Sequence, residues 1–135
     1  MMRQIDEKVM VSGQVAPDEV ASLAKQGITV LVNNRPDGED PAQPPGAELE
    51  AAATAAGIRY FSVPIIRGIG PADVEAMQQA LDDAEGGKLL AFCRSGMRSA
   101  LAIGLARRAQ GDSADEVRRG LVEAGFDPSP IAHLL

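Results

Sequence analysis

Aromatic side chains are scarce in this sequence. They make up 3% of its 135 residues, and tryptophan is absent. Proteins that bind single-stranded nucleic acid stack bases on such rings, so this composition gives stacking little to work with. Positive charge is also in short supply, because the formal net charge is −6 at pH 7. No overall positive field would attract a phosphate backbone, and we expect no nucleic-acid partner.

Long apolar runs and cysteine pairs are missing as well. No stretch approaches the roughly 18 uninterrupted apolar residues of a membrane span, and no basic segment with a following apolar run opens the sequence. Cys93 is the single cysteine and His133 the single histidine, so an internal disulfide and a thiolate metal cluster are excluded. We therefore expect no metal, no cofactor, no membrane association and a cytoplasmic location.

What the sequence does contain is an alternation of strand and helix signals. Apolar or β-branched runs predict strands within residues 4–13, 28–32, 58–63 and 88–92. Helices are predicted over 17–26, 47–56, 71–84, 97–110 and 114–125, and most are followed by a glycine. This order predicts a single α/β domain over residues 1–135. Its central sheet should be mostly parallel, have about four or five strands, and be covered by helices on both faces.

The strongest chemical signal follows the last predicted strand. Cys93 comes directly after that strand, and four residues separate it from Arg98, where a helix is expected to begin. Such a loop turns backbone N–H groups inward at the positive end of a helix dipole, and Gly96 permits the turn. The amides, the dipole and the Arg98 guanidinium all favour a thiolate that faces an anionic substrate.

We predict Cys93 and Arg98 to be the catalytic residues. Arg35 follows the strand at 28–32 and should emerge at the same sheet edge, either to bind a substrate anion or to pair with Asp37 or Glu39. The other predicted anion-binding residues lie in or next to the loop: Arg94, Ser95, Gly96, Met97 and Ser99. Ser99 is also a candidate hydrogen-bond donor to the sulfur. The alternative is that Cys93 is an inert buried cysteine. The basic groups that follow it in the loop make this alternative a poor fit.

Several segments together resemble a known bacterial family. They are Val11–Gln14, Asn33–Glu39, Gln43-Pro44, Val63–Ile65, Cys93–Ser99 and Ala124–Asp127. The family is related to the phosphatase-like domain of beta-lactamase-hydrolase-like proteins. The resemblance implies the fold of cysteine-dependent dual-specificity and tyrosine phosphatases. Members of this family are described both as phosphatase-like and as sulfur transferases, and fused relatives imply a link to persulfide dioxygenase or sulfide:quinone reductase.

Two features of the loop favour sulfur transfer. Phosphatases of this superfamily have one residue more between the cysteine and the arginine, and the shorter loop resembles that of rhodanese-type sulfurtransferases. Phe92 also stands where many phosphatases have a histidine. A tight ring of amides would suit a persulfide on Cys93 and would crowd a phosphoryl group. We therefore expect a sulfurtransferase that takes sulfane sulfur from thiosulfate or a persulfide.

The alternative reaction is hydrolysis of phosphate monoesters through a phosphocysteine on Cys93. It needs a general acid for the leaving oxygen, and the candidates are Asp37 and Asp73. Each also has a structural interpretation, Asp37 as a turn residue and Asp73 as a carboxylate in the first turn of a helix. Sulfur transfer needs little acid help, which again favours it. A module that binds anions without turnover is a third possibility.

Overall fold

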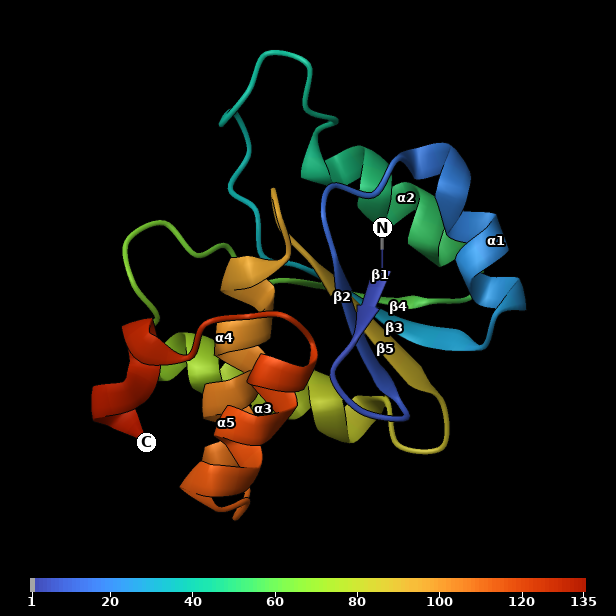
Figure 1. Cartoon of the computed structure of the whole chain (residues 1–135). Coiled ribbons are helices and arrows are strands. Elements are labelled where there is room, and N and C mark those ends of the chain that lie inside the picture. The colour runs from blue at the N-terminus through green and yellow to red at the C-terminus, as the bar shows by residue number, and fades with distance from the viewer. Residues whose placement is uncertain (1) are drawn as a thin grey trace.

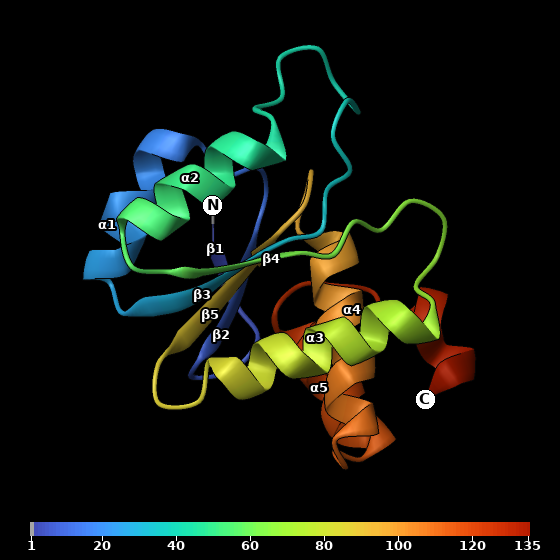
Figure 2. The ribbon, with the colours of Figure 1, turned by 180° about the vertical axis from the view of Figure 1, so that it is seen from behind.

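In the computed structural model, which describes residues 2–135, five strands form one sheet between two layers of helices (Figures 1 and 2). The strands are β1 (Met2–Gln4), β2 (Val9–Ser12), β3 (Ile28–Asn33), β4 (Arg59–Ser62) and β5 (Lys88–Phe92). Their order in the sheet is β1-β2-β5-β3-β4, and every pair is parallel except β1 with β2. The predicted α/β fold with a mostly parallel sheet is confirmed. The antiparallel β1 is new, because a single strand was expected within residues 4–13.

Helices cover both faces of the sheet. On one face lie α1 (Val20–Lys25) and α2 (Gly46–Ala55), and on the other lie α3 (Pro71–Asp83), α4 (Met97–Ala109) and α5 (Ala114–Glu123) (Figure 1). Two short 3-10 helices, η1 (Pro17–Glu19) and η2 (Ser129–Leu134), precede α1 and follow α5. No helix was predicted over the residues of η2. Among residues 2–135, no helix combines the length and the hydrophobicity needed to cross a bilayer.

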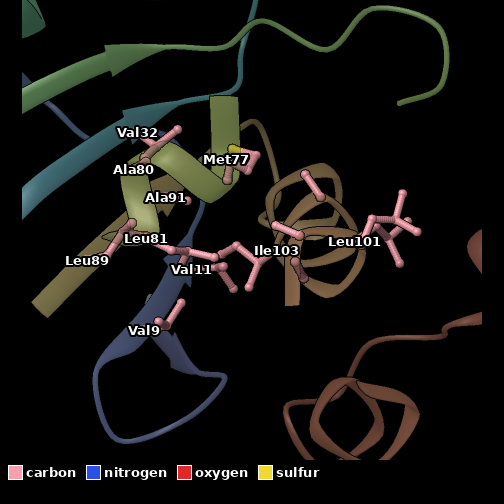
Figure 3. Packing of buried hydrophobic residues seen from close by; sticks show 14 of the residues in the cluster. Val9, Val11, Val32, Met77, Ala80, Leu81, Leu89, Ala91, Leu101 and Ile103 are labelled. Atoms are coloured by element: carbon pink, nitrogen blue, oxygen red, sulfur yellow. The ribbon is translucent and has the colours of Figure 1, made fainter. Parts of the chain in front are cut away.

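Alternation along β5 divides the apolar core into two clusters. Leu89 and Ala91 belong to the cluster under α3 and α4, whereas Leu90 and Phe92 belong to the cluster under α1 and α2. Successive side chains of a strand point to opposite faces, so a strand buried on both sides is apolar at every position. Figure 3 shows the first pair beside the side chains of α3, with Ile103 of α4 next to them.

The strand register brings three loops to one edge of the sheet. Phe92, at the end of β5, pairs with Ser12 at the end of β2 and with Asn33 at the end of β3. The residues that follow these strands therefore emerge side by side. Beyond the last paired residues, the Asn34 amide donates to the Phe92 carbonyl over 2.8 Å. This is the edge where ligands bind in open parallel sheets, and Cys93 lies on it.

Candidate active site

The loop between β5 and α4 bends around the sulfur of Cys93. Gly96 takes the left-handed conformation, with φ of 95°, and its amide donates to Cys93 Sγ over 3.1 Å. A Cβ at this position would lie 3.4 Å from the Ser12 carbonyl oxygen and 3.6 Å from the Phe126 ring. The positive φ therefore favours glycine here, whereas the neighbouring atoms lie at ordinary contact distances from such a Cβ.

The sulfur lies in a polar setting although it is fully buried. Cys93 has 0% of its surface exposed, yet it belongs to neither hydrophobic cluster. Its own amide donates to the Ser12 carbonyl over 3.3 Å, which ties the start of the loop to the end of β2. The sulfur thus has polar neighbours, and its role as a nucleophile stays a prediction.

Arg98, the second residue of α4, is held beside the loop by three hydrogen bonds. Its Nη1 and Nη2 donate to the two carboxylate oxygens of Glu39 over 2.8 and 2.9 Å, and Nη1 also donates to the Ile65 carbonyl over 2.9 Å. The hydrogen bond to Glu39 is the main reason that the pKa of Arg98 is raised, and the nearby Cys93 sulfur adds to it. Because one edge of the guanidinium is taken by Glu39, the Nε edge remains for a ligand.

Glu39 joins the two arginines of the site. Its Oε1 also accepts from Arg35 Nε over 2.9 Å, and Arg35 Nη1 donates to Gln14 Oε1 over 3.0 Å. The hydrogen bond from Arg98 is the largest cause that lowers the pKa of Glu39 from its ordinary 4.5 to about 2, and the bond from Arg35 acts in the same direction. Of the two roles considered for Arg35, the guanidinium here adopts the ion pair with Glu39.

The depressed pKa of Glu39 gives a testable pH dependence. A carboxylate of this kind stabilises the fold above its unfolded-state pKa, and the contribution is lost as the pH falls from about 4.5 to about 2. Over that interval the unfolding temperature of Glu39→Gln should fall less than that of the wild type, and thermal unfolding monitored by circular dichroism measures both. The exposed Glu75→Gln on α3 is the control and should follow the wild type. Parallel curves for all three proteins would contradict the assignment.

The two candidate general acids are both engaged at helix starts. Asp37 Oδ1 accepts from the amide of Gly46, the first residue of α2, over 2.8 Å. Asp73 Oδ2 accepts from the amide of Gly70, the residue before α3, over 2.9 Å. Carboxylates in these positions satisfy free helical N–H groups. Asp73 therefore has the helix-start contact considered as its alternative, whereas Asp37 accepts from the start of α2 and not from its own turn.

The remaining predicted loop residues are placed differently from one another. Arg94 and Ser95 are exposed, and Met97 is half-buried. Ser99 is fully buried, and its hydroxyl donates to Asn34 Oδ1 over 2.8 Å. A hydroxyl has one proton, so Ser99 does not donate to the sulfur as expected. It faces the end of β3 instead, where the buried Asn34 presents its oxygen.

Two residues of the site were not in the predicted set. Asn34 connects three elements, because besides the bond from Ser99 its Nδ2 donates to the Val63 carbonyl over 2.9 Å. Glu39 was named only as an alternative partner of Arg35, and its contact with Arg98 spans 59 positions of the chain. Both lie in the Asn33–Glu39 segment that carries the family resemblance, which was the available signal. Among the described residues, no group of three or more His, Cys, Asp or Glu could hold a metal ion.

Comparisons with known proteins agree on one family. The profile described as "Beta-lactamase hydrolase-like protein, phosphatase-like domain" matches residues 1–110. A beta-lactamase hydrolase-like protein of Xylella fastidiosa is 38% identical over 129 residues, which cover 91% of this chain and 29% of that protein. The chain thus spans less than a third of the length of the curated relatives it matches.

Solved structures agree with this family. A candidate phosphatase from Neisseria meningitidis is 32% identical and has a TM-score of 0.79, with 98% of this chain and 94% of that chain covered. Tk-PTP in its active form, at 21% identity and a TM-score of 0.69 over 98% and 93% of the two chains, shares the fold. The expected cysteine-phosphatase fold is therefore confirmed.

The expectation of rhodanese-like sulfur transfer is wrong. The family profile and the Neisseria structure are both phosphatase-like, and the fold is shared with PTP structures. Loop length misled the prediction, because a loop with four intervening residues still brings the Gly96 amide to the sulfur and Arg98 beside it. The link to persulfide dioxygenase or sulfide:quinone reductase rested on the same idea and loses its support. The chain belongs to the family of the phosphatase-like domain of beta-lactamase hydrolase-like proteins.

Proposed function

We propose that this chain hydrolyses phosphate monoesters through a phosphocysteine formed on Cys93. The observation that carries the proposal is the pairing of one sulfur with one guanidinium in a single loop. Cys93 Sγ accepts a hydrogen bond from the Gly96 amide, and Glu39 holds the Arg98 guanidinium beside the same loop. A family of phosphatase-like domains supports a small anionic substrate of this kind.

The reaction has two steps. Cys93 Sγ attacks the phosphorus, so that an S–P bond forms and the ester P–O bond breaks, with its electron pair leaving on the ester oxygen. Water then attacks the phosphocysteine, the S–P bond breaks with its pair returning to sulfur, and phosphate departs. Arg98 and the inward-facing loop amides stabilise the charge on the phosphoryl oxygens in both steps. Of the predicted anion-binding residues, Gly96 contributes its backbone amide, the Met97 amide donates to the Ser95 hydroxyl over 3.4 Å, and Arg94 and Ser95 are exposed.

Two features of the site shape the substrates we propose. Asp37 and Asp73 are occupied at helix starts, so a substrate whose leaving oxygen needs little protonation, such as an aryl phosphate, is favoured. Cys93 has no exposed surface, so the phosphate enters as the loop region opens. The Nε edge of Arg98 then receives two of its oxygens.

The direct test is hydrolysis of p-nitrophenyl phosphate under reducing conditions, with phosphate release followed on purified protein. We expect turnover that vanishes when Cys93 is alkylated beforehand. No phosphate release from aryl or acyl phosphates, or release that survives complete alkylation of Cys93, would overturn the proposal.

A further inference from the structure

An apolar hollow lies directly against Arg98. Its volume is about 390 Å³, and the loop between β4 and α3, the helix α4 and the C-terminal η2 enclose it. In both views the β4–α3 loop runs down to the C-terminal segment (Figures 1 and 2). The apolar side chains that line the hollow are Ile65, Ile66, Ile69, Leu101, Pro130, Ile131 and Leu134.

Two of these side chains are exposed to an unusual degree. Ile66 is 74% exposed and Leu134 is 51% exposed, and both belong to the few large hydrophobic residues that the described chain leaves in contact with water. Single exposed apolar residues are common on protein surfaces, but two at one hollow that Arg98 also lines form a shared apolar wall. An organic group that binds against this wall would remove the apolar side chains from water, which favours binding.

The position and charge of the hollow suggest its occupant. Arg98 lines the hollow, while its Nη1 donates to the carbonyl of Ile65, which lines it too. Among the described residues, its lining contains no carboxylate and no lysine, and His133 is the one other polar side chain. A ligand held here by its phosphate at Arg98 would place an uncharged organic group against the apolar wall.

We infer that this hollow binds the organic part of the substrate and selects phosphate monoesters whose organic part is apolar. The inference rests on the proposed function and deepens it. The hollow has room for an aromatic ring or a short alkyl chain. With Arg98 holding the phosphate, His133 is the one described side chain of its lining left to pair with the several hydroxyl groups of a sugar or the base of a nucleotide, most of which would be buried there unsatisfied.

Equilibrium binding of two phosphonates tests the inference without turnover, because their C–P bond is not cleaved by this chemistry. Octylphosphonate and methylphosphonate share one headgroup and differ in the apolar chain. We expect the wild type to bind octylphosphonate at least about tenfold more tightly, measured by calorimetry, since burying a few methylenes suffices for that ratio. Ile66→Ser and Leu134→Ser should each lower the ratio to about threefold or less.

Val122→Ser is the matched control, because Val122 is 60% exposed on α5 and does not line the hollow. It should keep the wild-type ratio. Equal affinity for the two phosphonates in the wild type, or ratios unchanged in the Ile66 and Leu134 variants, would overturn the inference. The inference would also be overturned if those variants changed their sedimentation but kept the wild-type affinity ratio for the two phosphonates. The apolar wall would then serve self-association.

The outcome separates the inference from the proposed function. Cys93-dependent hydrolysis without a preference for octylphosphonate would refute the hollow as a substrate site and leave the phosphatase standing. A preference that Ile66→Ser and Leu134→Ser abolish, in a protein that releases no phosphate, would support the hollow and refute the phosphatase.

Discussion

Replacing Cys93 with serine is expected to lower the rate of aryl phosphate hydrolysis by about 10³-fold or more, equivalent to roughly 4 kcal/mol in the barrier. The physical reason is the loss of the nucleophile. The Gly96 amide donates to Cys93 Sγ, and the Arg98 guanidinium lies beside it, so both neighbours are placed around the attacking atom. A serine hydroxyl in the same place has no neighbouring base to remove its proton, and Asp37 and Asp73 are engaged at helix starts.

Binding is the control for this variant. Sulfur and oxygen differ little in size, so the loop amides and Arg98 should still bind inorganic phosphate, which calorimetry can measure. Cys93→Ser should thus bind phosphate within about threefold of the wild type, a difference of less than 1 kcal/mol. A variant that keeps more than a tenth of the wild-type activity would show that another group attacks the phosphorus.

Replacing Arg98 with lysine is expected to lower kcat/KM by about 10² to 10³-fold, in the range found for removal of a single oxyanion-stabilising donor. The charge is retained, but the planar fork is lost. Lysine cannot donate to both carboxylate oxygens of Glu39 and the Ile65 carbonyl while also offering two parallel N–H groups to a phosphate.

The matched control is Arg67→Lys, which makes the same change at an exposed position in the loop before α3. Its kcat/KM should stay within about twofold of the wild type, because a solvated surface charge contributes little. If Arg98→Lys and Arg67→Lys behaved alike, the bidentate role of Arg98 would be refuted.

The sequence predicted the sheet well because its strands carry a strong local signal. β3 and β5 are buried over most of their length, so a run of mostly apolar or β-branched residues marked each of them. β1 was harder to predict, since Met2–Gln4 is exposed and includes Arg3 and Gln4. Its position as an antiparallel edge strand depends on pairing with β2 and leaves no apolar pattern behind.

The candidate site was predictable only in part. Cys93 and Arg98 lie in one short loop, and their spacing along the chain was enough to bring them together. Glu39 belongs to a loop with many polar residues, and nothing in its sequence surroundings reveals that it is the one whose carboxylate contacts Arg98. The predicted reaction was wrong because the prediction relied on the length of one loop more than on the family resemblance along the chain.

The central claim is that Cys93 accepts the phosphoryl group, and rapid acid quenching during turnover of p-nitrophenyl phosphate tests it most directly. Intact-mass and peptide analysis should then find one phosphoryl group on Cys93, at a level that rises in a burst before steady-state phosphate release. Turnover without any phosphoryl adduct on Cys93 at any quench time, or an adduct on another residue, would contradict the account.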